Sequence, residues 1–453
     1  MREGGLTLAD RLIEENLESS LGQLARLVGQ PSVSSQNVGM KECAELTASL
    51  LEEHGFSVRL LPTPTYPVVF AESPGATNRT LLCYNHYDVQ PAEPLELWNS
   101  PPFKLTERDG KLYGRGAADD KGHVISRLAA LQAVRVAHGE LPCRVKFVIE
   151  GGEEISSPHI PEFVQEHQEL LAADACIWES GGVDYDGRPS LILGMRGILY
   201  VQLNARSMSR DAHSGSAHLL PNAAWRLVRA LSTLKDEDER VLIPGFYEGA
   251  RPPNEHDLSL LEQLDMHETE QKESYGIESF VLGRTGLGAA TAVYSPTANI
   301  AGLSAGYEGP GPKTVIPSKA MAKIDFRLIP DQDPQEILEK LKSYMHDAGF
   351  DDIEVEALGG ERAATTPPDD PFVRMTGQTA LEIYGKPARI QPLIGGSGPM
   401  HPFREFLDLP VVTVGIGNPE NLIHAPNENI RTRDFVLGTR HMARLVERWT
   451  EIG

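Results

Sequence analysis

The sequence predicts an α/β protein in which a domain with an open, mixed sheet is interrupted by an inserted α+β domain of ferredoxin-like type. Three observations support this prediction. Short apolar runs, such as 80–84 and 143–150, lead into polar residues, which is typical of buried strands in an open α/β sheet. From residue 197 onward, alternating strands and amphipathic helices replace that pattern. After a Pro-rich linker at 363–371, the first pattern returns.

The length of the chain fits this division. Its 453 residues exceed what a single ordinary core accommodates, and 40% of them are hydrophobic, which is enough for two cores. We therefore expect one domain to comprise residues 1–196 and 363–453, and the inserted domain to comprise residues 197–362.

Each expected element has a periodic or compositional signal. Apolar residues recur at helical spacing over 8–29 and 39–55, and the second helix stops at Gly55. In the first part of the chain we then expect strands at 56–61, 67–71, 80–84, 143–150 and 173–178, and a helix from Lys121. In the inserted part the expected order is strand 198–207, helix 221–234, scattered helix at 257–274, strand 319–330, helix 333–349 and strand 352–358. A helix at 373–385, a buried strand at 411–417 and a helix at 432–450 complete the chain.

The charge of the chain argues against nucleic-acid and membrane partners. Lys and Arg total 42 against 64 Asp and Glu, a formal net charge of -22, which repels phosphate-rich surfaces. No run approaches the roughly 18 apolar residues of a membrane span, and the charged N-terminal stretch lacks the apolar segment of a signal peptide. The 4 cysteines are scattered, as free thiols in a reducing compartment would be. We therefore expect a cytoplasmic protein.

The stretch LLCYNHYDVQP at 81–91 contains the first candidate metal-binding group. A strand-like run leads into His86, and Asp88 follows two residues later, on the same face of an extended chain. Asp88 can then accept the ring N–H of His86, which would fix its tautomer and leave the other ring nitrogen for a metal ion. Taken alone, such a pair is more often an ordinary hydrogen bond, so the later stretches must decide.

Two later junctions carry pairs of adjacent carboxylates. Asp119 and Asp120 precede the helix that begins near Lys121, where one carboxylate can bridge metal ions and the other can cap the helix. Glu153 and Glu154 follow a buried strand through a Gly-Gly turn. Because two glutamates at a strand end repel each other, one of them tends to be protonated or bound to a metal ion.

Glu179 and His424 also lie just beyond predicted strands, so ligand-type side chains recur at the same edge of one sheet. Solvated pairs and core histidines are the structural alternative, but they do not explain this recurrence. Two imidazoles with several carboxylates favour two divalent ions, zinc first, with manganese or cobalt as alternatives. Such a pair of ions with a bridging water hydrolyses amides, and an uncoordinated glutamate can act as the base. Neither a Ser nor a Cys nucleophile stands in a nucleophile-elbow pattern.

A set of short motifs occurs in the order found in the M20 metallopeptidases: HYD, GRGAADDKG, EGGEE, RDAHSG, KTVIPSKAMAKIDFRLIP, GGSGP and IHAPNE. Over roughly 80–430 the chain resembles this family, and within it the carnosinase-type and bacterial dipeptidases. The resemblance implies a catalytic domain with two zinc ions and an inserted lid domain through which two copies form a homodimer. It also implies that the substrate is a small peptide or an N-acyl amino acid.

The resemblance also implies roles for individual residues. The implied metal ligands are His86, Asp119, Glu154, Glu179 and His424, with Asp119 shared between the two ions. Asp88 would orient His86, Glu153 would be the general base, and His213 would reach the reacting oxyanion in the partner subunit's site. The residues implied to bind a substrate carboxylate are Arg327, Gly395, Gly396 and Ser397.

Two positions differ from the dipeptidases that the chain resembles. Glu179 stands where these enzymes usually have aspartate, and Ile394 stands where they tend to have glutamate. Glutamate at the first position is more typical of the deacylase and carboxypeptidase branches. The leading interpretation is a dinuclear zinc hydrolase that cleaves dipeptides or small peptides bearing a free carboxylate. The alternatives are an N-acyl-amino-acid deacylase or carboxypeptidase, and a non-catalytic metal-binding member of the family.

Overall fold

The computed structural model describes residues 6–451, and their contacts divide the chain into two compact units. Unit 1 contains the described residues up to Gly194, Thr365–Pro392, and those from Pro399 onward; unit 2 contains Met195–Ala364 and Leu393–Gly398. The segment Leu393–Gly398 thus groups with unit 2, although it lies in the stretch predicted for the first domain. The domain boundaries drawn from the sequence remain predictions.

Unit 1 is built on a six-stranded mixed sheet with the strand order β1-β2-β6-β3-β7-β19. These strands are β1 (Ser57–Leu61), β2 (Val68–Ser73), β6 (Cys143–Glu150), β3 (Thr77–His86), β7 (Ala175–Trp178) and β19 (Val411–Thr413). The pairs β6–β3, β3–β7 and β7–β19 are parallel, and the other two pairs are antiparallel. Nearly all residues of β6 and β7 are buried, which explains their almost continuous apolar sequences. The predicted α/β class is confirmed.

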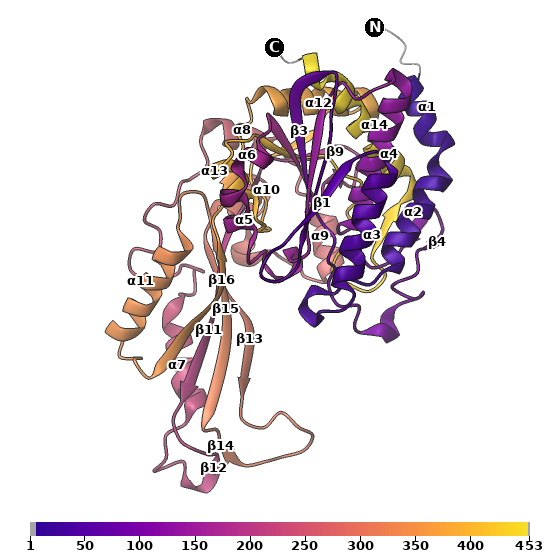
Figure 1. Ribbon diagram of the computed structural model, residues 1–453. Helices are drawn as coiled ribbons and strands as arrows, with labels where there is room; N and C mark the ends of the chain where they lie inside the picture. Colours follow the sequence, from indigo (N-terminus) through magenta and orange to yellow (C-terminus); the bar gives the residue numbers. More distant parts are fainter. Residues whose placement is uncertain (1–5, 452–453) are drawn as a thin grey trace. The chain divides into compact units, whose positions relative to one another are not determined.

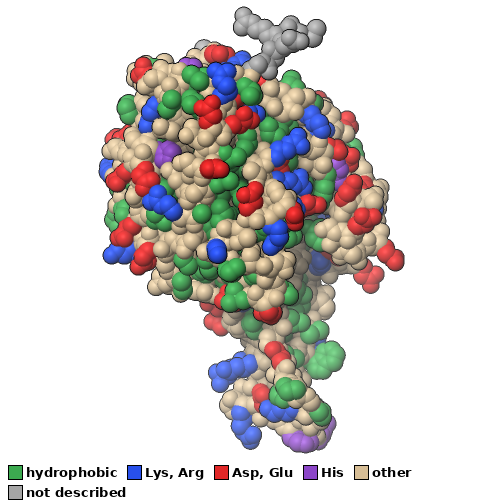
Figure 2. Space-filling model, turned by 90° about the vertical axis from the view of Figure 1, so that its right-hand side faces the viewer, with side chains coloured by type: hydrophobic (Ala, Val, Ile, Leu, Met, Phe, Trp, Pro, Cys, Tyr) green, Lys and Arg blue, Asp and Glu red, His purple; other side chains and the backbone are tan. Residues whose placement is uncertain are grey.

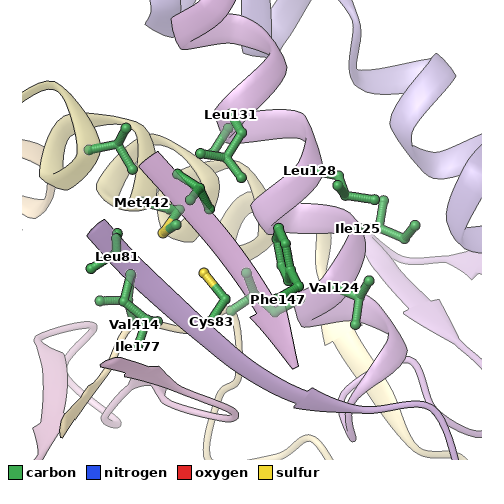
Figure 3. Close-up of a cluster of buried hydrophobic side chains, with 14 of the residues drawn as sticks. Leu81, Cys83, Val124, Ile125, Leu128, Leu131, Phe147, Ile177, Val414 and Met442 are labelled. Carbon is green, nitrogen blue, oxygen red and sulfur yellow. The ribbon is translucent and has the colours of Figure 1, made fainter. Parts of the chain in front are cut away.

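Helices cover this sheet, and two of them pack on each other over its centre. The helices of unit 1 are α1 (Leu8–Glu15), α2 (Leu17–Gly29), α3 (Met40–Glu53), α4 (Lys121–His138), α5 (Ile160–Glu166), α6 (Gln168–Leu171), α12 (Pro371–Tyr384), α13 (Met400–Glu405) and α14 (Thr432–Arg448). Leu128 and Leu131 of α4 and Met442 of α14 lie over the strands that carry Leu81 and Phe147 (Figure 3). This core holds in place the helix that begins directly after the Asp119–Asp120 pair.

Two small sheets complete unit 1. One contains β4 (Thr106–Arg108), β5 (Lys111–Tyr113) and β20 (Asn429–Arg431), and the other contains β8 (Gly182–Val183), β9 (Pro189–Ile192) and β18 (Arg389–Gln391). The antiparallel pairing of β5 with β20 brings the chain just after His424 beside the chain just before Asp119. Segments that are distant in the sequence therefore meet at one place in the fold.

Unit 2 has a four-stranded antiparallel sheet, β13-β15-β11-β16, with α7 and α11 on one face (Figure 1). Its main elements are β11 (Gly197–Arg206), α7 (Ala223–Leu234), β13 (Thr297–Ala305), β15 (Lys319–Leu328), α11 (Pro334–Asp347) and β16 (Ile353–Glu361). Shorter elements are β12 (Ala212–His213), β14 (Val315–Ile316), α8 (Glu255–Glu262), α9 (Glu268–Tyr275) and α10 (Gly286–Thr291). Burial alternates strictly along β11 and β15, because one face of the sheet packs on the helices. This element order is that of a ferredoxin-like fold, as predicted.

Three of the differences between the structure and the expected elements have a physical cause that the structure shows. The helix expected at 8–29 is two helices, because the chain turns at Asn16, whose side-chain amide donates to Leu12 O at 2.8 Å. The strand expected at 411–417 ends at Thr413, and Gly415 then packs so closely on Gly181 that a Cβ would lie 2.3 Å from a carbonyl oxygen. Strand β13 lies in a stretch for which the sequence analysis expected no element. It is an edge strand with mostly exposed residues, so it has no alternating pattern.

The surface and the thiols bear on the predicted partners and compartment. Acidic and basic side chains are interspersed over the face shown in Figure 2. Among residues 6–451, no helix is both long and apolar enough to cross a membrane. All 4 cysteines are buried and unpaired. The absence of nucleic-acid and membrane partners remains a prediction.

Candidate active site

Three parallel strands deliver ligand-type side chains to one edge of the unit 1 sheet. Strand β3 lies between β6 and β7, and His86 at its end is in register with Glu150 at the end of β6. Glu153 and Glu154 follow β6 in a short 3-10 turn, and Glu179 follows β7 directly. Carboxyl ends of parallel strands lie on the same side of a sheet, so these side chains converge as predicted from their positions.

His86, Asp119 and Glu179 form the more deeply buried part of the cluster. The Nε2 atom of His86 lies 3.0 Å from Asp119 Oδ1 and 3.7 Å from Glu179 Oε2. The His86 side chain is fully buried, and Glu179 Oε2 is buried without a hydrogen-bond partner among the described residues. A buried carboxylate oxygen without a partner is costly unless a cation or a donor binds it.

His424 and Glu154 form the second part of the cluster. The Nε2 atom of His424 lies 3.0 Å from Asp119 Oδ2 and 3.1 Å from Glu154 Oε2. The two oxygens of Asp119 therefore face different imidazoles. His424 has a left-handed backbone with a φ of 62°, and its side chain is 52% exposed. Left-handed backbone in a non-glycine residue is uncommon and recurs at functional sites.

Neighbouring side chains fix the orientation of His86 and Glu154. The Nδ1 atom of His86 lies 3.1 Å from Asp88 O and 3.3 Å from Asp88 Oδ1, so both the backbone and the carboxylate contact the ring. The Asp88 carboxylate also accepts the backbone N–H groups of Glu153 and Glu154. Gln90 donates through its backbone and its side chain to the Glu154 carboxylate, at 3.1 and 2.9 Å. Asp88 thus positions both the imidazole and the turn that carries the two glutamates.

Glu428 is a site residue to which the sequence analysis assigned no role. Its fully buried carboxylate accepts Arg115 Nη1 at 2.7 Å and the backbone N–H groups of Gly116, Ala118 and Asp119. It therefore ties the loop that carries Asp119 to the loop that carries His424. Both Arg115 and Glu428 lie inside the motifs quoted above, so the motifs were the available signal.

Asp120 supports His86 and does not cap the helix with its side chain. It occupies the N-cap position of α4 but makes no side-chain capping hydrogen bond, so the expectation of a cap is wrong. Asp120 Oδ2 instead accepts Asn85 Nδ2 at 2.5 Å and the backbone N–H of His86 at 3.2 Å. Asp120 Oδ1 lies 3.0 Å from His123 Nδ1. The Asp120 carboxylate therefore supports the strand end that carries His86.

The charges in the cluster shift the pKa values of its members strongly. Burial lowers the pKa of His86, but the carboxylates of Glu179, Asp119 and Asp88 outweigh it and raise that pKa well above the ordinary value. Hydrogen bonds to Asp119 and Glu154 raise the pKa of His424 to about 10. Without a metal ion, the two imidazoles therefore take up protons. The group of carboxylates therefore favours positive charge beside it.

Glu153 shares a raised pKa with Glu179, whose carboxyl group burial also shifts well above the ordinary value. Burial, together with the charge of Glu179, raises the pKa of Glu153 well above that of an ordinary glutamate. Its backbone N–H donates to Asp88 Oδ1 at 3.3 Å, which places it at the start of the turn. A carboxyl group with a raised pKa can take up a proton and return it near neutral pH.

The residues present fit a site for two divalent ions. His86, Asp119 and Glu154 place ligand atoms within 4.8 Å of one another, and so do His86, Asp120 and Glu179. Imidazole and carboxylate donors suit zinc, manganese and cobalt. A divalent ion would satisfy the Glu179 oxygen that lacks a hydrogen-bond partner. The two oxygens of Asp119, which face different imidazoles, could serve as ligands to two ions. The identity of the metal remains a prediction.

The remaining predicted site residues belong to unit 2. Arg327 Nη1 donates to Ser397 Oγ at 2.7 Å, so the Gly395–Ser397 loop lies beside this guanidinium. Arg196, which the sequence analysis did not identify, donates to Arg327 O at 3.0 Å, and its backbone N–H donates to Gly396 O. His213 is exposed, and its Nδ1 accepts the backbone N–H of Gly215 at 2.9 Å. The Nε2 atom of neutral His213 therefore carries the proton and can donate it in a hydrogen bond.

Comparison with known proteins identifies relatives of the chain. A profile of peptidase family M20/M25/M40 matches residues 82–448. The chain is 28% identical over 402 residues to Beta-Ala-His dipeptidase of Rattus norvegicus, which covers 84% of this chain and 79% of that protein. It is 28% identical over 402 residues to cysteinylglycine-S-conjugate dipeptidase of Corynebacterium striatum, covering 86% of each.

Solved structures agree with the sequence comparison. The M20 family metallo-carboxypeptidase Sso-CP2 from Sulfolobus solfataricus has a TM-score of 0.92 at 35% identity, covering 96% of this chain and 99% of that one. Human carnosine dipeptidase 1 has a TM-score of 0.84 at 26% identity, covering 98% of this chain and 99% of that one. The family resemblance predicted from the motifs is confirmed. The chain belongs to peptidase family M20/M25/M40 and is a metallopeptidase.

Proposed function

We propose that the chain is a dipeptidase that holds two divalent ions, zinc first, and cleaves the peptide bond next to a free carboxylate. The observation that carries this proposal is the position of Asp119, whose two oxygens face His86 and His424 at 3.0 Å each. Glu179 completes one side of this arrangement and Glu154 the other. The relatives named as dipeptidases support the substrate class.

The chemistry divides between the ions and the residues of the chain. When bound, the two ions would act as Lewis acids that polarise the substrate carbonyl and lower the pKa of a water molecule. Glu153 takes the proton of that water and returns it to the leaving amine. Asp88 keeps this glutamate in place through the backbone of the turn and holds His86 at its Nδ1 edge. His213 donates Nε2–H to the oxyanion in the partner subunit's site of the proposed homodimer.

Arg327 is the proposed partner of the substrate carboxylate. Its planar guanidinium can bind a carboxylate through two parallel hydrogen bonds, and Ser397 holds it from one side. Gly395 in the adjoining loop is open to a ligand, since a Cβ there would meet nothing within 4 Å among the described residues. A Cβ at Gly396 would make ordinary contacts with the side chains of Ile394, at 3.6 Å, and Met195, at 3.9 Å. Unit 2 would thereby select substrates that carry a free carboxylate.

A carboxypeptidase or N-acyl-amino-acid deacylase is the second candidate. The similarity to a metallo-carboxypeptidase at 35% identity favours it, as does Glu179 in place of aspartate. Both candidates use the same ligands, the same base and the same carboxylate partner. They differ in whether the substrate's amino group is free or acylated.

A panel of substrates separates the two candidates. The protein, loaded with zinc or manganese, would be given free dipeptides, N-acetyl and N-succinyl amino acids, and dipeptide amides without a carboxylate. We expect free dipeptides to be cleaved and the amides to be resistant. Cleavage of acylated amino acids alone would move the chain to the second candidate, and equal cleavage of the amides would contradict the role of Arg327.

Two further properties remain part of this proposal. We propose a homodimer formed through unit 2, which sedimentation of the purified protein would test.

We also propose a cytoplasmic location, because 4 buried, unpaired cysteines fit a reducing compartment. Fractionation of cells that produce the protein would test it.

A further inference from the structure

In the sheet of unit 1, the pairing of β3 with β7 ends just before the proposed metal ligands His86 and Glu179. Strands β3 and β7 pair in parallel through Cys83 and Ile177, and their registered pairing ends there. The next residues, Tyr84 and Trp178, lie beyond the paired positions. His86 and Glu179 follow at once, so the separation of the two chains at this point governs the distance between two proposed ligands of the same ion.

The guanidinium of Arg127 bridges the two chains at this point. Arg127 comes from α4 and is 1% exposed. It donates to Tyr84 O at 2.7 Å and to Trp178 O. One planar group therefore connects the two strands where the registered pairs have ended. The rings of Tyr84 and Trp178 stack at 4.1 Å, so the same two residues are also joined through their side chains.

The same guanidinium also determines how Asn85 is oriented. It donates to Asn85 Oδ1, and because a guanidinium has no acceptor, the amide must present its oxygen to Arg127. The NH₂ group of Asn85 then faces Asp120, to which it donates. Asp120 in turn accepts the backbone N–H of His86. A chain of hydrogen bonds thus runs from Arg127 to the residue that carries the first imidazole.

The fold alone does not require a cation at this position. Arg127 lies on α4 between core residues, with Leu128 next to it in the hydrophobic cluster. A buried charge is expensive, and an apolar side chain of similar volume is often equally stable. Arg127 Nε has no hydrogen-bond partner among the described residues, so even this cation is not fully satisfied. All the hydrogen bonds of the Arg127 guanidinium go to the two strand ends and to the Asn85 amide.

We propose that Arg127 is a positioning residue that sets the spacing of the strand ends carrying His86 and Glu179, and thereby the affinity for the ion that they bind. The proposal rests on the proposed two-ion site. It predicts that the fork geometry of the guanidinium matters as well as its charge, because a lysine cannot reach several acceptors in one plane.

The test compares metal affinities of four proteins: the unchanged chain, Arg127→Met, Arg127→Lys and the control Arg135→Met. Arg135 lies on the same helix and donates to His54 O and to Ser73 Oγ at 2.8 Å, so it also ties backbone together, but away from the strand ends. Each metal-free protein would be titrated with Zn²⁺ against a chromophoric chelator. The visible absorption of the Co²⁺ form would report the ligand geometry.

We expect Arg127→Met to lower the affinity for the ion that His86 and Glu179 are proposed to bind at least tenfold. Arg127→Lys should lower this affinity by a smaller factor and alter the Co²⁺ spectrum. The control should keep both ions at unchanged affinity. Unchanged affinity and spectrum in Arg127→Lys would overturn the proposal, whether or not Arg127→Met folds. If the unchanged chain itself binds no zinc, the two-ion site fails and the proposal for Arg127 falls with it, whereas an effect of Arg135→Met equal to that of Arg127→Met would overturn the role of Arg127 alone.

Discussion

The side chains proposed to bind metal ions in unit 1 and those proposed to bind substrate in unit 2 are held in different ways. In unit 1, His86 is fully buried and its two ring nitrogens face Asp88 and Asp119. In unit 2, His213 is exposed and a backbone N–H two residues away orients its ring. The imidazole of His86 is thus fixed by buried partners at both of its ring nitrogens. The exposed imidazole of His213, which is proposed to meet a substrate, keeps the freedom to adjust to it.

Removing the metal ions should have the largest effect, and it should lower the stability of unit 1 without changing that of unit 2. Exhaustive chelation would abolish turnover, and zinc or manganese would restore it. Unit 1 should lose stability, because ions bound at 100 times their Kd stabilise a protein by about 2.7 kcal/mol. Calorimetry should show a lowered transition for unit 1 and an unchanged one for unit 2. A common shift of both would show that the units unfold as one.

Replacing the proposed base should leave the metal cluster intact. We expect Glu153→Gln to lower kcat by roughly 10²–10⁴-fold, since proton transfer contributes a factor of that size. The ions should remain, because other side chains hold them, and metal analysis after gel filtration would establish this. Glu150→Gln is a matched control on the same segment. A Glu153→Gln protein with near-normal turnover would show that another group is the base.

Changing the exposed imidazole of unit 2 should affect the rate and leave the metal untouched. We expect His213→Ala to lower kcat about 10²-fold, as the loss of an oxyanion donor does. His218→Ala, a few residues away in the same segment, serves as the control. Steady-state kinetics and metal content would be measured on both. Loss of bound metal in the His213 variant would place it with the ligands of unit 1.

The last expected effect is on stability alone and concerns a buried histidine that belongs to neither group. Burial lowers the pKa of His441 to about 4 from an ordinary 6.5, so the folded protein keeps it neutral. Unfolded chains bind that proton more readily, so the stability it supports is complete above pH 6.5 and is lost as the pH falls towards 4. The loss amounts to about 3 kcal/mol.

Urea unfolding at pH 7 and pH 4.5 would measure this contribution. His441→Gln keeps a donor for Thr376 O, which the imidazole Nε2 contacts at 3.1 Å, but cannot take up a proton. We expect the variant to lose about 2–3 kcal/mol less stability than the unchanged protein over this pH range. An equal loss in both proteins would mean that other groups cause the acid sensitivity.

The sequence revealed the parts of this molecule whose signals are local. Helix α11 and strand β15 have clear periodicities, and the ligand-type residues at strand ends could be placed because parallel strands end on one side. Strand β13 was missed because an exposed edge strand needs no alternating pattern. Glu428 and Arg127 were missed because their roles arise from contacts between segments far apart in the sequence.

The order of synthesis has a consequence for this site. His424 and Asp119 are 305 residues apart, and Glu428 holds the Asp119 loop from a similar distance. At 5–20 residues per second, roughly 15–60 s of translation separate the two ends of the cluster. During that interval the early carboxylates lack their second imidazole and the tether that places Asp119. A growing chain on the ribosome therefore has an incomplete set of the proposed ligands until the segment that carries His424 and Glu428 has been synthesised.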